Sequence, residues 1–153
     1  MLELPHTLFG ALIGIKIQNP FISLPLAFAS HFALDLIPHW NPSLYSEYEQ
    51  FGHPKKSSTL IIIFDTVISL ISGILIATTV LPDIKRFIVV LLACFLAVLP
   101  DVIEGPFFFF SLKWPILIKI IDFQRGHQGK AKLPWGMVTQ LVAIIIIFIV
   151  FQL

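Results

Sequence analysis

The stretch Ser30-His31-Phe32-Ala33-Leu34-Asp35-Leu36-Ile37-Pro38-His39-Trp40 closes a strongly apolar run that begins near Phe21. If residues 23–37 are helical, His31 and Asp35 lie one turn apart on the same face, roughly 6 Å along the axis. Pro38 disfavours helical geometry at the preceding residue, so the helix is expected to end there, with His39 just beyond it. Helical His and Asp residues at this spacing can chelate a metal ion, and they also form ordinary structural pairs. This stretch alone leaves both interpretations open.

The composition indicates an integral membrane protein. Of the 153 residues, 57% are hydrophobic, 12% are charged and 15 are Phe. Soluble domains have about 25% charged residues, and several apolar runs here approach or exceed the ~18 residues that suggest a membrane span. We therefore expect residues 1–153 to form a single integral membrane domain. The net charge of +1 gives no sign of a nucleic-acid partner.

The hydropathy pattern predicts an all-α fold, a polytopic membrane bundle of four to five inserted helices plus an interfacial helix. The apolar segments that enter the bilayer are expected at residues 6–17, 21–37, 59–81, 87–99 and 135–153. The first segment holds Gly10 and Gly14, a pair of small residues that lets another helix approach closely. The aromatic block 107–110 and the mixed stretch 111–122 are predicted to form the interfacial helix, at headgroup level. Residues 41–58 and 123–133 are predicted to be polar connections.

Most ionisable residues of the apolar segments are expected at one face of the membrane. An up-and-down path returns the chain to the face of His6 after the turns at Asn19-Pro20 and at residues 82–86. The residues that it brings to one layer are His6, His31, Asp35, His39, Asp65, Asp101, Glu104 and His127. A charge at the bilayer centre costs roughly 2.5–3.5 kcal/mol, and clustered carboxylates repel each other unless a cation neutralises them. This pattern predicts a shared metal or proton site, with helix capping and interface polarity as the alternative.

Asp65 discriminates between these alternatives. It lies about two turns inside the segment 59–81, where the sequence offers it no helix end to cap and no interface to reach. Metal–ligand distances near ~2 Å force ligands from different helices to converge. We therefore expect one cavity, with ligand atoms roughly 3–5 Å from a common point, to contain the side chains of His6, His31, Asp35, Asp65 and Asp101.

Three short motifs resemble those of small bacterial inner-membrane proteins classed as membrane-bound metal-dependent hydrolases. They are His6-Thr7-Leu8-Phe9-Gly10-Ala11-Leu12-Ile13-Gly14, Ser30-His31 with Asp35, and Leu99-Pro100-Asp101. That family commonly continues with Asp-His and Arg-Gly-x-Thr-His-Ser, where this chain has Val102-Ile103-Glu104 and Arg125-Gly126-His127-Gln128-Gly129. The stretch 30–40 and Pro134-Trp135-Gly136 also resemble small membrane proteins with the pattern Ser-His-x-x-Leu-Asp-x-x-Pro-His-Trp and no established activity.

The resemblance and the polar layer together suggest a metal-dependent hydrolase acting at the membrane surface. The expected metal ligands are His6, His31, Asp35, Asp65 and Asp101. Such mixed ligands suit Zn, Mn or Fe, which would activate a water molecule as the nucleophile. His39 and His127 are candidate ligands or general acid/base groups, and Glu104 is a candidate to orient the water. A lipid or other phosphoester is the expected substrate, because the site opens where headgroups lie.

Two other classes of protein use comparable polar clusters. A proton-coupled transporter could relay protons along His and Asp side chains, although the sequence shows no polar path to the opposite face. A non-enzymatic assembly protein could use the same residues to hold helices together. The face that carries the cluster has seven of the ten Lys and Arg residues, which predicts that this face is cytoplasmic. We therefore expect a multi-pass protein of the inner (plasma) membrane with a cytoplasmic N-terminus.

Overall fold

The computed structural model describes residues 1–152, which contain seven helices joined by loops and turns. They are α1 (Glu3–Lys16), α2 (Pro20–Asp35), α3 (Leu44–Phe51), α4 (Lys56–Thr78), α5 (Ile84–Phe110), α6 (Pro115–His127) and α7 (Trp135–Gln152). No β-strand occurs among these residues, where only an isolated parallel bridge pairs His39 with Lys130. The prediction of an all-α fold is therefore confirmed.

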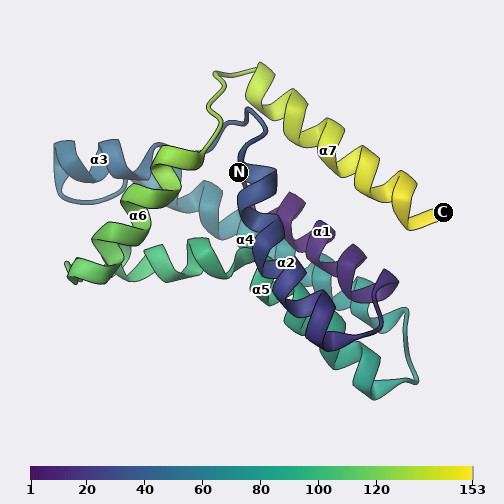
Figure 1. Cartoon of the computed structure of the whole chain (residues 1–153). Coiled ribbons are helices and arrows are strands. Elements are labelled where there is room, and N and C mark those ends of the chain that lie inside the picture. Colours follow the sequence, from purple (N-terminus) through teal and green to yellow (C-terminus); the bar gives the residue numbers. More distant parts are fainter. Residues whose placement is uncertain (153) are drawn as a thin grey trace.

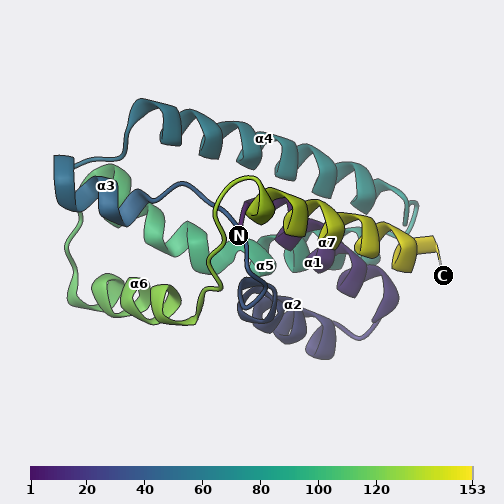
Figure 2. The ribbon, with the colours of Figure 1, turned by 90° about the horizontal axis from the view of Figure 1, so that it is seen from above.

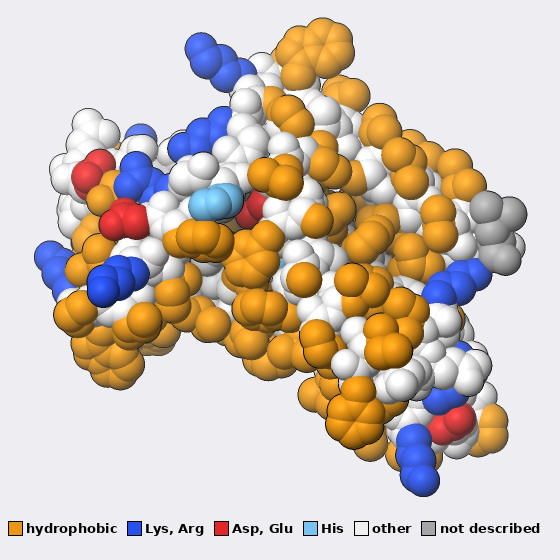
Figure 3. Space-filling view, in the orientation of Figure 1, with side chains coloured by type: hydrophobic (Ala, Val, Ile, Leu, Met, Phe, Trp, Pro, Cys, Tyr) orange, Lys and Arg blue, Asp and Glu red, His pale blue; other side chains and the backbone are white. Residues whose placement is uncertain are grey.

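Three of the helices, α4, α5 and α7, are long and apolar enough to cross a membrane. This number is lower than the four to five inserted helices that the hydropathy pattern predicts. The difference lies in α1 and α2, which have 14 and 16 residues. They extend about 21 and 24 Å, against a hydrocarbon core of about 30 Å. Hydrophobic side chains cover much of the outer surface, including that of α7 (Figure 3), as expected for contact with lipid.

Helix α1 lies within the bundle and contacts α2, α4, α5 and α7 (Figures 1 and 2). Nine of its 14 residues are buried. Its closest approach is to α5, because a methyl group at Gly10 would lie 2.6 Å from the carbonyl oxygen of Ala93 and 2.8 Å from the Cβ atom of Ala97. Gly14 packs in the same way against Val90 and Ala93. The pair of small residues thus permits close helix packing, as the sequence predicts.

Helix α5 does not end near residue 99, as the run of apolar residues predicts. It continues through Pro100 and Pro106 to Phe110. A proline inside a helix removes one backbone hydrogen bond, and it bends the helix rather than ending it when packing compensates for the loss. The compensation here comes from Phe107 and Phe108, which form an apolar cluster with two residues of α6.

Helices α3 and α6 lie at one end of the bundle, beside the C-terminal part of α5 (Figures 1 and 2). The predicted polar connection at 41–58 contains the eight-residue α3. The predicted interfacial helix is displaced towards the C-terminus, because Pro115 occupies the first turn of α6, where a proline needs no hydrogen-bond partner. At the opposite end, the last turn of α1 is joined to the first turn of α5 by the Arg86 guanidinium, which donates to the carbonyl oxygen of Ile15 at 3.1 Å.

Candidate metal centre

A cluster of buried polar side chains lies where α1, α2 and α5 meet. The imidazoles of His6 and His31 are fully buried, and their rings stack with centroids 4.2 Å apart. Together with Asp101, each offers one possible ligand atom, and these three atoms lie within 4.8 Å of one another. The predicted convergence of these three residues is therefore present in the fold.

Asp35 connects this group to a third imidazole. One of its oxygens, Oδ1, lies 3.3 Å from Nε2 of His6 and 3.8 Å from Nε2 of His39, and the other lies 3.5 Å from Nε2 of His31. The α-amino group of Met1 also contacts Asp35, and it lies 3.3 Å from Nε2 of His6. The carboxylate is thus surrounded by nitrogen atoms from α1, α2 and the segment that follows α2.

The hydrogen bonds of His31 fix which ring nitrogen carries a proton. Nδ1 lies 2.8 Å from the carbonyl oxygen of Ala97, which can only accept a hydrogen bond, so Nδ1 must donate. Nε2 then faces three oxygen atoms, which belong to Asp35 and Asp101 at 3.5 Å and to Gln124 at 3.2 Å. In a neutral ring the Nε2 lone pair would repel these oxygens. The arrangement is attractive only with a second proton or a metal ion at this position.

His39 is held beside the cluster by its backbone. Its N–H donates to the carbonyl oxygen of Gly129 at 3.1 Å, and its own carbonyl oxygen accepts from the N–H of Ala131 at 2.8 Å. A side chain at Gly129 would lie 2.5 Å from the carbonyl oxygen of Leu36, so this close approach requires glycine. Nδ1 of His39 donates to the carbonyl oxygen of Ile37, which directs Nε2 towards Asp35. Burial lowers the pKa of His39 below its ordinary value, which favours the neutral ring.

Gln124 joins the cluster to Glu104. Its side-chain amide donates to the carboxylate of Glu104 at 2.6 Å and to the carbonyl oxygen of Pro100 at 3.1 Å. Our interpretation of the sequence missed this residue. A signal was present, because Gln124 continues at helical spacing the buried positions Leu117 and Ile121 of α6. A polar residue in such a stripe needs a buried partner.

Asp65 makes a contact with α1 that the sequence does not predict. Its carboxylate accepts a hydrogen bond from the backbone N–H of Glu3, at the first turn of α1, and therefore caps that helix from α4. The expectation that no helix end lies within its reach is wrong, because the hydropathy pattern does not show that α1 begins opposite the third turn of α4. Asp65 lines the cavity described below but is not a member of the close group of His6, His31 and Asp101.

His127 does not join the cluster. It is the last residue of α6, not part of a loop, and its side chain is exposed. Nδ1 donates to the carbonyl oxygen of Phe123 at 2.8 Å, and the two rings contact each other at a tilt of 34°, with centroids 4.2 Å apart. The extension of α6 to this residue places the imidazole away from the carboxylates that the sequence predicts as its neighbours.

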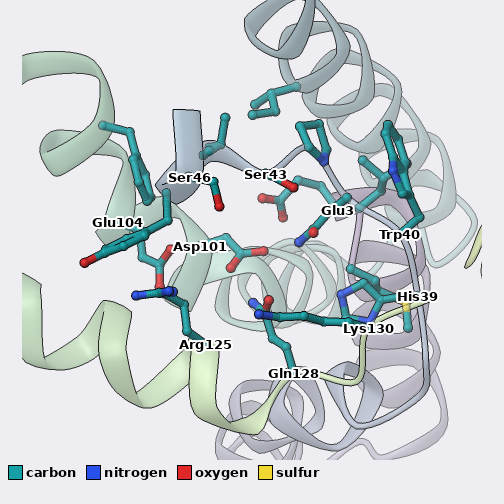
Figure 4. Close-up of a pocket in the computed structure, with 18 of the residues that line it drawn as sticks. Glu3, His39, Trp40, Ser43, Ser46, Asp101, Glu104, Arg125, Gln128 and Lys130 are labelled. Carbon is teal, nitrogen blue, oxygen red and sulfur yellow. The ribbon is translucent and has the colours of Figure 1, made fainter. Parts of the chain in front are cut away.

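A cavity of about 450 Å³ opens beside the cluster. Asp101 and His39 belong to both the cavity wall and the cluster, so the cavity leads to the buried ligand atoms. Glu104 also lines this cavity, near Arg125 in Figure 4. Glu3 also lines the cavity, with a buried carboxylate oxygen that has no hydrogen-bond partner in the described chain. Nothing in the sequence distinguishes Glu3, because an acidic residue is ordinary in the first turn of a helix.

The donor set fits a divalent metal ion. Imidazole nitrogens mixed with carboxylate oxygens suit Zn, Mn or Fe. His31 and His39 each donate from Nδ1 to a backbone carbonyl oxygen, which is the usual way in which a protein orients a ligating histidine. The buried Nδ1 atom of His6 has no hydrogen-bond partner among residues 1–152. His6, His31, Asp35 and Asp101 are therefore the residues best placed to hold an ion.

Comparison of the chain with models of protein families, with curated proteins and with solved structures found no match.

Proposed function

We propose that the protein is a metal-dependent hydrolase of the membrane surface, with one divalent ion held by His6, His31, Asp35 and Asp101. The observation that carries the proposal is the environment of His31. Its Nδ1 is committed to the carbonyl oxygen of Ala97, and its Nε2 faces two carboxylates and an amide oxygen. A metal ion at this position would satisfy all of these groups at once.

The proposal includes a position in the membrane. Helices α4, α5 and α7 cross the bilayer, while α1 and α2 are inserted beside them, which gives the predicted four to five inserted helices. α6 lies at headgroup level with exposed Ile116, Ile118 and Lys119 on its outer surface. The excess of Lys and Arg at this end favours the cytoplasmic side of the inner membrane. The cavity then opens near the lipid headgroups.

The chain supplies the remaining groups that hydrolysis needs. A bound divalent ion would lower the pKa of water and so provide a nucleophile at neutral pH. His39, which lies on the cavity wall and has a pKa lowered by burial, is the candidate general base or acid. Glu104 is held by Gln124 and can accept a hydrogen bond from an attacking water molecule. Because the cluster is buried, water and substrate can reach it only from the cavity.

Metal analysis of detergent-purified protein tests the metal centre. Wild type is compared with Asp35→Asn and with His31→Gln, and Asp83→Asn serves as the matched control because Asp83 is exposed and caps α5 at the other end of the bundle. Wild type and control should retain one ion per chain, and each ligand variant should lose affinity by about 10-fold or more. Equal metal content in all four proteins, or none in wild type, overturns the proposal.

A structural role is the second candidate, and one observation favours it. The α-amino group of Met1 and three imidazoles surround Asp35, so these groups can satisfy one another and join α1 to α2 without an ion. Metal-dependent release of phosphate from a phosphoester by wild type, lost in His31→Gln, supports the hydrolase. Full stability without metal, together with no hydrolysis at any metal concentration, supports the structural role instead.

A further inference from the structure

We propose that the cavity binds a phosphate monoester, whose anionic oxygens contact Arg125, Lys130 and Lys132. This inference rests on the proposed function and names the chemical class of its substrate. All three cations line the cavity that leads to Asp101 and His39. Arg125 and Lys130 lie on opposite sides of it, from α6 and from the loop before α7 (Figure 4). The phosphate group would thus lie between the cations and the metal centre.

Arg125 is oriented by an aromatic ring. Its guanidinium carbon lies 3.4 Å from the centroid of the Tyr45 ring, across the gap between α6 and α3. Its one ion pair within residues 1–152, with Asp122 of the same helix, is long at 3.8 Å and exposed. Stacking occupies the face of the guanidinium and leaves its N–H edge free, which is the edge that binds phosphate oxygens in a bidentate manner.

The two lysines lie on a segment whose backbone is fixed. Lys130 pairs with His39 in the isolated bridge, and the adjacent Ala131 donates to the carbonyl oxygen of His39. Neither Lys130 nor Lys132 has a carboxylate within 4.0 Å in the described part of the chain. Their charges are therefore available to a ligand. The backbone hydrogen bonds to His39 hold the segment that carries them beside the cluster.

Most of the acidic residues of the cavity do not compete for these cations. Asp65 accepts from the backbone of α1, Glu104 accepts from Gln124, and Asp101 lies beside His31. Three of the acidic side chains that line the cavity thus have partners of their own, while the three cations line the same cavity. An anion that reaches both the cations and a metal ion bound at Asp101 completes this arrangement.

The charge and size of the site favour a monoester. A phosphate monoester carries about −1.5 to −2 charges at neutral pH, which three cations can match better than the single charge of a diester. The volume of about 450 Å³ lies within the range of small-molecule sites, about 300–1,000 Å³. Phe109 and Leu133 line the same cavity and are exposed. They offer an apolar surface to an acyl chain, so the phosphate can belong to a lipid or to a soluble compound.

Calorimetry on the full-length, metal-loaded protein in detergent tests the inference. The probes are dihexanoyl phosphatidic acid as a lipid monoester, glycerol 3-phosphate as a soluble monoester, and dihexanoyl phosphatidylcholine as a diester. We expect binding of at least one monoester and none of the diester. Arg125→Gln and Lys130→Gln should each weaken that binding by about 10-fold. Lys119→Gln, an exposed change on α6 outside the cavity, should leave it unchanged.

The outcomes separate this inference from the proposed function. Stronger binding of phosphatidic acid than of glycerol 3-phosphate assigns the site to a lipid, and the reverse assigns it to a soluble monoester. An equal loss in Lys119→Gln, or equal binding of phosphatidylcholine, overturns the phosphate site even where metal analysis supports the metal centre. Monoester binding without any metal-dependent hydrolysis overturns the hydrolase and leaves the binding site standing.

Discussion

The Nε2 atom of His31 lies 3.5 Å from an oxygen of Asp101, and this contact joins α2 to α5 directly after Pro100. The same nitrogen lies 3.5 Å from Asp35, one turn further along α2. Two carboxylates from different helices thus meet at one imidazole. The stability of this junction depends on the positive charge that lies between them, whether a proton or a metal ion provides it.

Removal of metal should therefore destabilise the junction. We expect chelation to lower the melting temperature of wild type, because an ion at about a hundred times its Kd contributes about 2.7 kcal/mol to the folded state. Asp101→Asn should show a smaller difference between the melting temperatures with and without chelator, since it has lost a ligand. Asp83→Asn, at the other end of the bundle, should respond as wild type does. Thermal denaturation in detergent measures all three, and an unchanged wild type contradicts the expectation.

The hydrogen bond by which Asp65 caps α1 leads to a separate prediction about stability. Asp65→Ala should cost about 1 kcal/mol, within the range of about 0.5–2 measured for caps, because the N–H of Glu3 loses its acceptor. Asp65→Asn keeps an acceptor oxygen and should lie near wild type. Both variants should retain the metal content of wild type, as measured on purified protein. Loss of metal in Asp65→Asn would instead identify Asp65 as a ligand.

The elements that follow from local hydropathy were predictable. The lengths of the apolar runs predict α4 and α7 and the two short segments that precede α4. They also predict that Asp35 and Asp101 return to the same end of the bundle. Within the site, the approach of His6, His31, Asp35 and Asp101 follows from this up-and-down path. These features depend on the length and position of apolar runs, which a single sequence shows directly.

Other features depend on contacts between helices, which a hydropathy pattern does not contain. The continuation of α5 past Pro100 depends on packing against α6. The contact that Asp65 makes depends on which turn of α4 lies beside the first residue of α1. The absence of His127 from the cluster depends on where α6 ends. In each case the residue type was visible in the sequence, and its neighbour was not.

The unpartnered oxygen of Glu3 leads to an expectation that differs in size between metal-free and metal-loaded protein. In metal-free protein, Glu3→Gln should raise the melting temperature, because it replaces a buried carboxylate that lacks a partner and such groups cost about 1–3 kcal/mol. With metal present, the gain should shrink, since a nearby cation stabilises the carboxylate. Paired thermal melts measure both values, and a lower melting temperature without metal would show that Glu3 has a partner.

The contact between α1 and α5 should tolerate no added methyl group. Gly10→Ala places a Cβ atom 2.6 Å from the carbonyl oxygen of Ala93, and we expect a loss of about 1–3 kcal/mol from overpacking. Gly126→Ala is the matched control on α6, because no atom lies within 4 Å of its added Cβ. That variant should be neutral or gain up to about 1 kcal/mol from helix propensity. Equal melting temperatures for the two variants would contradict the close packing.

The orientation in the membrane is open to direct labelling. Ser46 of α3 and Asp83 before α5 are both exposed and lie at opposite ends of α4. We expect Ser46→Cys, in a Cys94→Ala background, to react only with reagents that reach the cytoplasm, because seven of the ten Lys and Arg residues lie at its end. Asp83→Cys should react from the opposite side in intact cells. Labelling of both positions from one side would show that α4 does not cross the bilayer, and exchanged sides would reverse the orientation while leaving the helix in place.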